Sequence, residues 1–395
     1  RAYAPKNDAK YISNSHDYIL MYAKAIENFQ IGRLPRTEEA NARYQNPDND
    51  PRGVWKPSDM SVKTYNAECD YPITTPSGRV IEPPTGRCWR LSKKAFLERL
   101  QDNRIYFGAG GNSVPCIKRF LTELKYDGMA PTSLMFYKDV GHSQEGAKEV
   151  TALLEAGAFD GPKPVRLLKR LITLANTNKD NNDIILDFFS GSATTAQAVM
   201  QLNAEDGGNR RYICVQLPEV CGEKSEAFKA GYKNICEIGK ERIRRAGAKL
   251  AGDHPALDVG FKAFKLDTSN MKLWDDTPIE GGDVATLFDR IDGHIDGLKP
   301  DRSDEDLIFE ILLKMGYPLT AGLAALDVDG LTVYKVEGGT MLVCLQEGIT
   351  AEHIEQMAAL SPQKIVLAGR GLADSSTKAN AFYLLENRGI ELKTV

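Results

Sequence analysis

The sequence lacks several features that would place it in a familiar class. It has 7 cysteines and 5 histidines in 395 residues, and no two cysteines stand in a CxxC spacing, so neither a zinc site nor a disulfide scaffold is indicated. No apolar run approaches the roughly 18 residues that cross a bilayer, and the first ten residues, RAYAPKNDAK, do not resemble a signal peptide. The composition therefore predicts a globular protein of two or three domains in a reducing, intracellular compartment, with no metal site and no membrane segment.

Charge is unevenly distributed along the chain. Residues 1–250 carry 37 Lys and Arg against 30 Asp and Glu, whereas residues 251–395 carry 13 against 24. A basic first part and an acidic last part predict that only the first part contacts a polyanion. Two domains with differently solvated surfaces would explain the same asymmetry, and charge alone leaves both explanations open.

The first third of the chain shows little regular periodicity. The apolar run at 18–22 is typical of a short strand. Residues from about 30 to 112 lack helical periodicity and are rich in turn signals, such as NPDNDPRG at 46–53. We therefore expect an irregular insertion with short strands, and loops of this length are uncommon unless they are functional.

Helical periodicity begins near residue 143. Helices are predicted at 143–157 with Ser143 as N-cap, at 162–176 and at about 224–250. The last of these has an apolar stripe, and its other faces carry basic residues that include Lys240, Arg242 and Arg244.

The C-terminal part has a pattern of its own. We expect a strand at 261–267, a polar connector with one short helix at 268–302, and a helix at 303–316 that begins with a capping box of Ser303 and Asp306. Alternating strand and helix patterns then run to the last residue, which predicts a small separate α/β unit.

The clearest element is a hydrophobic strand at 183–189, of the kind buried on both faces in a parallel sheet. It enters a turn of small residues, SGSATT, and opens into a helix. A second strand is predicted at 211–217. This order is the first βα turn of a doubly wound sheet, where small residues let a nucleotide-like ligand approach the backbone. Only Gly191 is a glycine, so the dinucleotide fingerprint is absent, and no P-loop lysine is present. An ordinary βα turn with small residues for packing is the alternative.

The turn carries a resemblance to a known family. LDFFSGSATTAQAVMQLN resembles the FxGxG cofactor motif of amino-methyltransferases that act on DNA, and the likeness extends upstream to FDGPKPV at 159–165 and downstream through GGNRRYICVQLPE and GFKAFKLDTSNMKLWD. From NPDNDPRGVW to the C-terminus the chain resembles the modification subunits of type III restriction-modification systems. Those proteins are β-class, S-adenosylmethionine-dependent DNA adenine-N6 methyltransferases.

The resemblance implies a fold and a division of the chain. The fold is a partial Rossmann-like α/β methyltransferase with an irregular DNA-recognition insertion and a small C-terminal α/β domain. The implied parts are the end of the catalytic half at 1–45, the target-recognition insertion at 46–130, the cofactor-binding half at 131–255 and an assembly domain at 256–395.

The resemblance also implies which residues bind S-adenosylmethionine. The strand-end carboxylate would accept from the amino group of the cofactor, and a polar residue after the second strand would hold the ribose hydroxyls. The expected cofactor-binding residues are Lys163, Pro164, Asp187, Phe188, Phe189, Ser190, Gly191, Ser192, Thr194, Thr195, Gln216 and Glu219.

Two departures from the family pattern stand out. The last glycine of FxGxG is Ala193, which narrows the turn. The catalytic tetrapeptide Asp-Pro-Pro-Tyr is absent, since the nearest match, Glu82-Pro83-Pro84-Thr85, lacks the aromatic residue. In the family this motif precedes the turn of small residues around Gly191, called the glycine turn from here on. The chain is therefore expected to be a C-terminal portion of such a subunit, and no catalytic residue is assigned to it.

Arginine mixed with aromatic residues in the insertion suits phosphate contact and base-edge readout. The predicted DNA contacts are Arg52, Lys56, Arg87, Arg90 and Arg104, while Trp55 and Trp89 are candidates for the core of a small sub-domain. The resemblance implies double-stranded DNA, a second copy of the chain and a Res helicase-nuclease subunit as partners, in the bacterial cytoplasm. A non-catalytic DNA-binding specificity and assembly module is the competing hypothesis.

Overall fold

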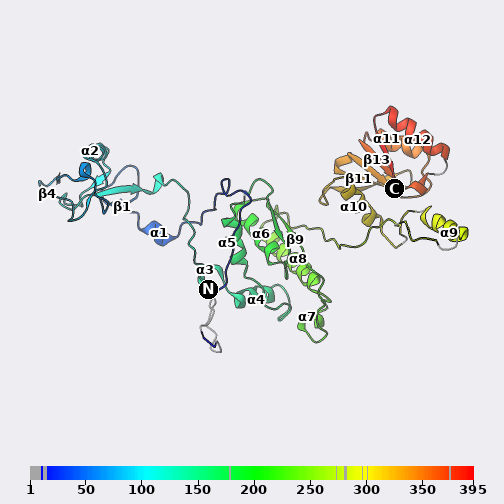
Figure 1. Ribbon diagram of the computed structural model, residues 1–395, viewed down its shortest axis with the longest axis horizontal. Helices are drawn as coiled ribbons and strands as arrows, with labels where there is room; N and C mark the ends of the chain where they lie inside the picture. The colour runs from blue at the N-terminus through cyan, green and yellow to red at the C-terminus, as the bar shows by residue number, and fades with distance from the viewer. Residues whose placement is uncertain are drawn as a thin grey trace. The chain divides into compact units, whose positions relative to one another are not determined.

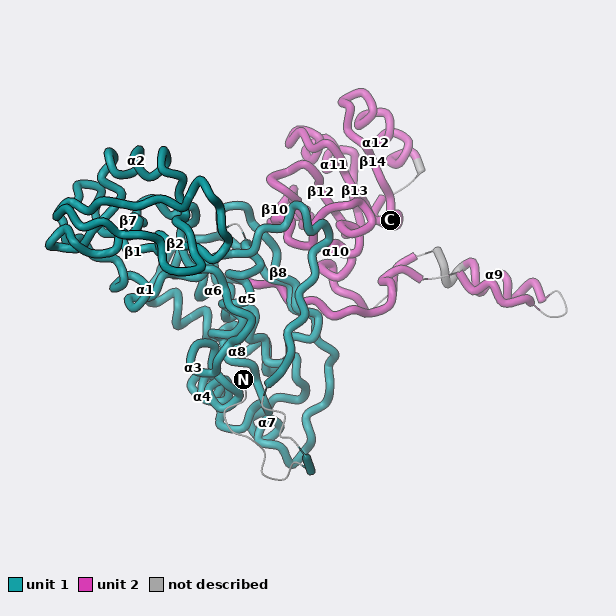
Figure 2. The backbone as a smooth tube through the Cα atoms, turned by 60° about the vertical axis from the view of Figure 1, so that its left-hand side comes forward, with its two compact units in different colours: residues 1–260 teal, residues 261–395 magenta. Residues whose placement is uncertain are grey.

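The computed structural model describes residues 10–11, 16–177, 179–272, 274–279, 283–295, 297–299, 301–372 and 375–395. The N-terminal segment that lacks signal-peptide features lies almost entirely outside the described residues. The chain divides into two compact units, 1–260 and 261–395, which are coloured separately in Figure 2. Both units mix helices and strands, as expected for an α/β protein.

Short antiparallel strands build the insertion in the first unit (Figure 1). One sheet has the order β1-β7-β6, and two pairs, β2–β5 and β3–β4, accompany it. The bounds of these elements are α1 Glu38–Ala42, β1 Trp55–Asp59, β2 Ser61–Val62, β3 Ile73–Thr74, β4 Val80–Ile81, β5 Cys88–Trp89, α2 Lys93–Gln101, β6 Ile105–Tyr106 and β7 Cys116–Phe120. The prediction of an irregular insertion with short strands is confirmed, but it missed the helices α1 and α2. The N-cap of α2, Ser92, accepts from the Ala95 N–H.

Both tryptophans of the insertion are core residues. Trp55 is 3% exposed and Trp89 is 1% exposed. The Trp89 Nε1–H donates to the carbonyl of Tyr71 at 2.7 Å, and the Trp55 Nε1–H donates to Asp48 at 2.9 Å. Because each buried indole N–H has a partner, the rings stabilise the insertion without a polar penalty.

A buried ion-pair network joins the start of the insertion to β7. The side chain of Lys118 is fully buried and its Nζ pairs with Asp48 and, at 3.0 Å, with Asp50. Arg52 also pairs with Asp50, at 2.8 Å. The Arg52 guanidinium, assisted by Lys118, holds the pKa of Asp50 well below its usual range. The network ties the loop before β1 to the centre of the sheet.

Replacing Lys118 by methionine is expected to lower the free energy of unfolding of the insertion by about 3 kcal/mol, because removing one partner leaves buried carboxylates uncompensated. Denaturant unfolding and hydrogen exchange of β1 and β7 would measure the effect. Lys125→Met, at an exposed position of the same region, is the matched control. Equal stability of the two variants would contradict the prediction.

The rest of the first unit surrounds the glycine turn. Helices α5 Val165–Leu174 and α6 Thr194–Asp206 pack on the parallel pair β8 Ile184–Asp187 and β9 Arg211–Cys214, and α8 Ile235–Asp253 packs against α6 (Figure 1). The remaining helices are α3 Tyr137–Val140, α4 Ser143–Thr151 and α7 Glu226–Lys229. The strand and helix predicted on either side of the turn are therefore confirmed.

The two-stranded sheet is covered on one face. Ile185 and Tyr212 pack against α5 and α6, whereas Ile184, Leu186 and Ile213 are 52%, 57% and 49% exposed. Successive side chains of a strand point to opposite faces, so the helices cover one row and leave the other open. The expectation of a strand buried on both faces is wrong for the described residues.

Two helix predictions need correction in detail. The helix expected over 224–250 is divided into α7 and α8, because Gly231 has a φ of 98° and Asn234 starts a new helix by accepting from the Glu237 N–H. The N-cap of α4 is His142 rather than Ser143, which is the first helical residue.

The second unit is a five-stranded mixed sheet with helices on both faces. The order is β10-β11-β12-β13-β14, antiparallel in the first two pairs and parallel in the last two. Helices α11 and α12 share one hydrophobic cluster and α10 packs in another, on opposite rows of the same strands. The bounds are α9 Val284–Ile295, α10 Asp304–Lys314, β10 Leu323–Val328, β11 Leu331–Val336, β12 Met341–Cys344, α11 Ala351–Ala359, β13 Lys364–Leu367, α12 Ser375–Asn387 and β14 Glu391–Thr394.

Most expectations for this unit are confirmed. The capping box of Ser303 and Asp306 is present, and the strand–helix alternation after residue 340 is observed. The hairpin of β10 and β11 was not predicted. The strand expected at 261–267 is wrong, as is the one at 18–22, where the side chains are largely exposed and no strand pairing occurs.

Candidate functional site

The turn between β8 and α6 is held by the last residue of the strand. The Asp187 carboxylate accepts from the Thr195 hydroxyl at 2.5 Å through one oxygen and from the Phe189 N–H at 3.2 Å through the other. It thus ties the end of β8 to the first turn of α6. A carboxylate has about four lone-pair sites, so Asp187 keeps the capacity to accept from a ligand.

The backbone of the turn requires small residues at specific places. Gly191 has a φ of 51°, and a Cβ there would lie 2.9 Å from Cζ of Phe159. Ala193, where the family pattern has glycine, is also left-handed, with φ 59° and ψ 40°. The Ala193 side chain is buried and faces Gly239 on α8, where an added Cβ would lie at an ordinary contact distance of 3.5 Å from the Cβ of Ala193. The turn thus keeps its left-handed backbone with alanine in place of the glycine of the family pattern.

Gln216 lies against the turn. Its Oε1 accepts from the Gly191 N–H at 2.7 Å, so the structure brings this predicted residue to the glycine. Glu219 lies on the segment after β9 and is exposed. Of the two candidates for the ribose hydroxyls, only Gln216 contacts the turn by a described hydrogen bond.

The side chains of the turn divide into an outer and an inner set. Phe188 and Phe189 are 62% and 76% exposed, and their ring centroids are 5.2 Å apart. Ser192, Thr194 and Thr195 are almost fully buried. Any contact of the inner set with a ligand would come from the backbone, because these hydroxyls point into the protein.

The upstream segment 159–165 also reaches the turn. Phe159 packs on Gly191, Pro164 is buried and serves as N-cap of α5, and the exposed Lys163 precedes it. The Val165 N–H donates to Glu149 on α4 at 2.9 Å. Burial raises the pKa of Glu149. The two segments expected to form one site are thus neighbours.

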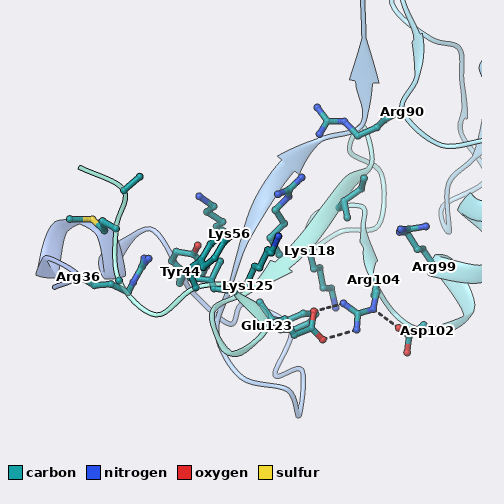
Figure 3. Close-up of a pocket in the computed structure, with 18 of the residues that line it drawn as sticks. Arg36, Tyr44, Lys56, Arg90, Arg99, Asp102, Arg104, Lys118, Glu123 and Lys125 are labelled. Atoms are coloured by element: carbon teal, nitrogen blue, oxygen red, sulfur yellow. Dashed lines mark hydrogen bonds and ion pairs between the residues drawn. The ribbon is translucent and has the colours of Figure 1, made fainter. Parts of the chain in front are cut away.

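A cavity lies elsewhere in the first unit, beside the β1-β7-β6 sheet. It measures about 950 Å³, and 9 of its 21 lining residues are Lys or Arg against 3 that are acidic (Figure 3). Three predicted DNA contacts, Lys56, Arg90 and Arg104, line it. Sequence reasoning missed the other exposed or partly exposed cations of this lining, which are Arg33, Arg36, Arg99, Arg119 and Lys125.

Some of the predicted arginines are held in ion pairs within the protein. Arg104 lies between Glu123 and Asp102 (Figure 3), and it lowers the pKa of Glu123. Arg52 pairs with Asp50 and lies over the Phe120 ring, 4.5 Å from its centroid. Arg87 lies outside the cavity lining and donates to Ser61.

Lys56 and Arg119 form a pair of like charges in the sheet. They are directly opposite each other in the antiparallel register of β1 and β7, and both line the cavity. Like charges directly opposite on neighbouring strands destabilise a sheet. A polyanion at this face would offset that repulsion. The sequence signal that could have identified Arg119 is the alternation of side chains along a strand, which places Arg119 on the opposite face of β7 from the buried Lys118.

One buried charge was also missed. Arg242, placed by the sequence among the polar faces of a helix, is 0% exposed and contacts the glycine turn. Among the described residues, no group of three or more His, Cys, Asp or Glu could hold a metal ion, and no described helix is long and apolar enough to span a bilayer.

Residues 2–244 match the family described as DNA methylase (N6_N4_Mtase). The chain belongs to this family. It is 35% identical over 285 residues to the StyLTI Mod subunit of a type III restriction-modification enzyme from Salmonella typhimurium, covering 71% of this chain and 42% of that protein. This methylase sequence also resembles the EcoPI Mod subunit of Escherichia phage P1, with 28% identity over 90% of this chain and 58% of that protein.

A type II relative matches as well. The methyltransferase M.KpnI of Klebsiella pneumoniae is 26% identical over 60% of this chain and 59% of its own length. The chain thus spans about half the length of the curated relatives it matches. The resemblance to type III modification subunits that the sequence motifs indicated is confirmed.

Proposed function

We propose that this chain is part of a modification subunit of a type III restriction-modification system, which transfers a methyl group from S-adenosylmethionine to the N6 amine of adenine in double-stranded DNA. Its parts are those implied by the sequence: an insertion that binds the DNA target, a half of a Rossmann-like domain that binds the cofactor, and a C-terminal assembly domain. The membership of residues 2–244 in the DNA methylase family carries the proposal.

The glycine turn fits the methyl donor. Its exposed aromatic pair, Phe188 and Phe189, offers rings on which a purine can stack. The α6 N-terminus has no side-chain cap, so the positive end of its dipole, next to the turn, is not neutralised by a capping side chain. Asp187 and Gln216 would orient amine and hydroxyl groups, and the bound cofactor would supply a methyl group activated by a sulfonium. These features favour a ligand site over an ordinary packed turn.

The open face of the β8–β9 sheet supports the Rossmann-like assignment. Ile184, Leu186 and Ile213 form an apolar row that no described helix covers. Parallel sheets occur almost always with both faces covered. A larger doubly wound sheet with helices on its second face would account for that row.

Calorimetric titration of the chain with S-adenosylmethionine tests the cofactor assignment. Saturable binding to one site per chain is expected, together with binding of double-stranded DNA in a gel-shift assay. DNA binding without any cofactor binding would instead favour the competing hypothesis of a non-catalytic specificity and assembly module.

The second unit is assigned to protein contact, with a second copy of the chain and a Res subunit as the proposed partners. Residues 261–395 carry 13 basic against 22 acidic residues, and this charge disfavours approach to phosphates. The apolar face of α10, with Leu307, Ile311 and Leu312, is already buried in the core of the unit, so other surfaces must make the contact.

Removing residues 261–395 is expected to weaken self-association and partner association in sedimentation. The dependence of DNA affinity on salt concentration should stay nearly unchanged, because this unit is expected to make no phosphate contacts. A clear fall in the salt dependence of the truncated chain would mean that the acidic unit contacts the DNA backbone.

A further inference from the structure

Arg242 is a buried charge beneath the glycine turn. It lies on α8, on the same face as Gly239, where the helix approaches the carbonyl of Gly191 so closely that a Cβ at 239 would lie 3.3 Å from that oxygen. The side chain is 0% exposed. The guanidinium therefore sits between α8 and the start of α6, out of reach of solvent.

The hydrogen bonds of Arg242 all go to the turn and to α6. Its Nη1 donates to Ser192 Oγ and to Thr194 Oγ1, each at 2.8 Å. Its Nε donates to Gln197 Oε1 at 2.9 Å. One side chain thus fixes the last part of the turn and the first turn of the helix that follows it.

This arrangement is electrostatically unfavourable. Arg242 has no carboxylate within ion-pair distance among the residues that the structure describes, and its Nη2 is buried there without a hydrogen-bond partner. It also places a cation at the positive end of the α6 dipole. Burial lowers its pKa to about 10, and only the more distant charge of Glu149 acts in the opposite direction. A buried charge of this kind costs stability.

Glu149 is a second charged residue that contacts the site, at the segment 159–165 before α5. It accepts from the Val165 N–H at the start of α5, and its charge and that of Arg242 favour each other. The two charged residues thus hold the starts of α5 and α6, the two helices whose preceding loops are expected to contact the methyl donor.

We propose that Arg242 is a positioning residue for the methyl-donor site, which holds the Ser192–Thr194 backbone in the shape that binds the cofactor at the expense of fold stability. The inference rests on the proposed function. It assigns no contact between Arg242 and the donor, because the side chain lies on the inner side of the turn.

The test compares Arg242→Met, Arg242→Lys and the control Arg244→Met in the full chain. Arg244 lies on the same helix with 57% of its side chain exposed. For each variant, calorimetry gives the dissociation constant for S-adenosylmethionine, thermal unfolding gives Tm, and hydrogen exchange reports on the peptide covering 188–197. DNA affinity serves as a second control.

Arg242→Met is expected to weaken donor binding about 30-fold or more and to speed exchange in 188–197, while Tm stays within a few degrees of the unsubstituted chain or rises. Arg242→Lys keeps the charge but lacks the planar guanidinium with its several donors. Its donor affinity and its exchange rate in 188–197 should lie between those of Arg242→Met and those of the unsubstituted chain. Arg244→Met should change none of these quantities.

A residue that only supports the fold would behave differently. Its removal would lower Tm and leave the donor affinity of the folded protein unchanged, and that result would overturn the inference. Unaltered exchange in 188–197 for Arg242→Met would overturn it as well. If the unsubstituted chain binds no S-adenosylmethionine, the proposed function fails, and the exchange measurement still decides whether Arg242 holds the turn.

Discussion

Replacing Asp187 by alanine is expected to abolish measurable binding of S-adenosylmethionine in a chain that stays folded. The carboxylate joins the end of β8 to Thr195 and Phe189 and lies directly before the glycine turn. Losing two hydrogen bonds to a charged group, and any bond to the ligand, corresponds to at least about 100-fold in affinity. Calorimetry at matched protein concentration would measure the change.

Two further variants separate the roles of the carboxylate. Asp187→Asn keeps the shape and one acceptor oxygen, so part of the turn geometry should survive while the charge is lost. Thr195→Val removes only the internal hydrogen bond and should weaken binding less than Asp187→Ala. If Asp187→Ala is folded by circular dichroism and binds the donor with unchanged affinity, the site has been misplaced.

Replacing both Lys56 and Arg119 by alanine is expected to weaken DNA binding more than any other pair of substitutions in the insertion. These cations face each other across β1 and β7 and line the same cavity. If each neutralises one phosphate, the slope of log K against log salt should fall by about 2, with a loss of roughly 30-fold in affinity at low salt. Gel-shift or anisotropy titrations at several salt concentrations would measure both quantities.

Arg104→Ala is the matched control in the same cavity. Because Arg104 is held by Glu123 and Asp102, its removal should affect the local fold more than the number of neutralised phosphates. An unchanged salt slope for the double variant, or a larger change for Arg104→Ala, would contradict the assignment of phosphate contacts. The double variant itself should be at least as stable as the unsubstituted chain, since it relieves a repulsion.

Strong local signals explain what the sequence could predict. The strand before Gly191 and the helix after it combine a run of branched apolar residues with a turn of small ones, and both elements are present. Ser303 and Asp306 mark the start of α10 by a capping box whose geometry is entirely local. Such elements form from interactions between near neighbours in the chain, so their position can be read without knowledge of the tertiary structure.

Elements that depend on distant partners were predicted poorly. The apolar run at 18–22 has the composition of a strand, but no described strand pairs with it, and a strand needs a partner for its backbone hydrogen bonds. Arg242 looked like a solvated helix residue, because nothing in the sequence places Ser192 and Thr194 beside it. The cavity in the insertion likewise depends on pairing between β1 and β7, which are more than 55 residues apart.

The left-handed alanine in the turn has a consequence for ligand exchange. A glycine at position 193 would sample both signs of φ when the site is empty, whereas an alanine is confined to fewer conformations, and the left-handed one is about 1 kcal/mol strained. The strain is carried by the folded protein before any ligand arrives. Because alanine prefers negative φ, the packing around the turn must hold residue 193 in the left-handed conformation, and any loosening of that packing would let the residue leave it and weaken capture of the ligand.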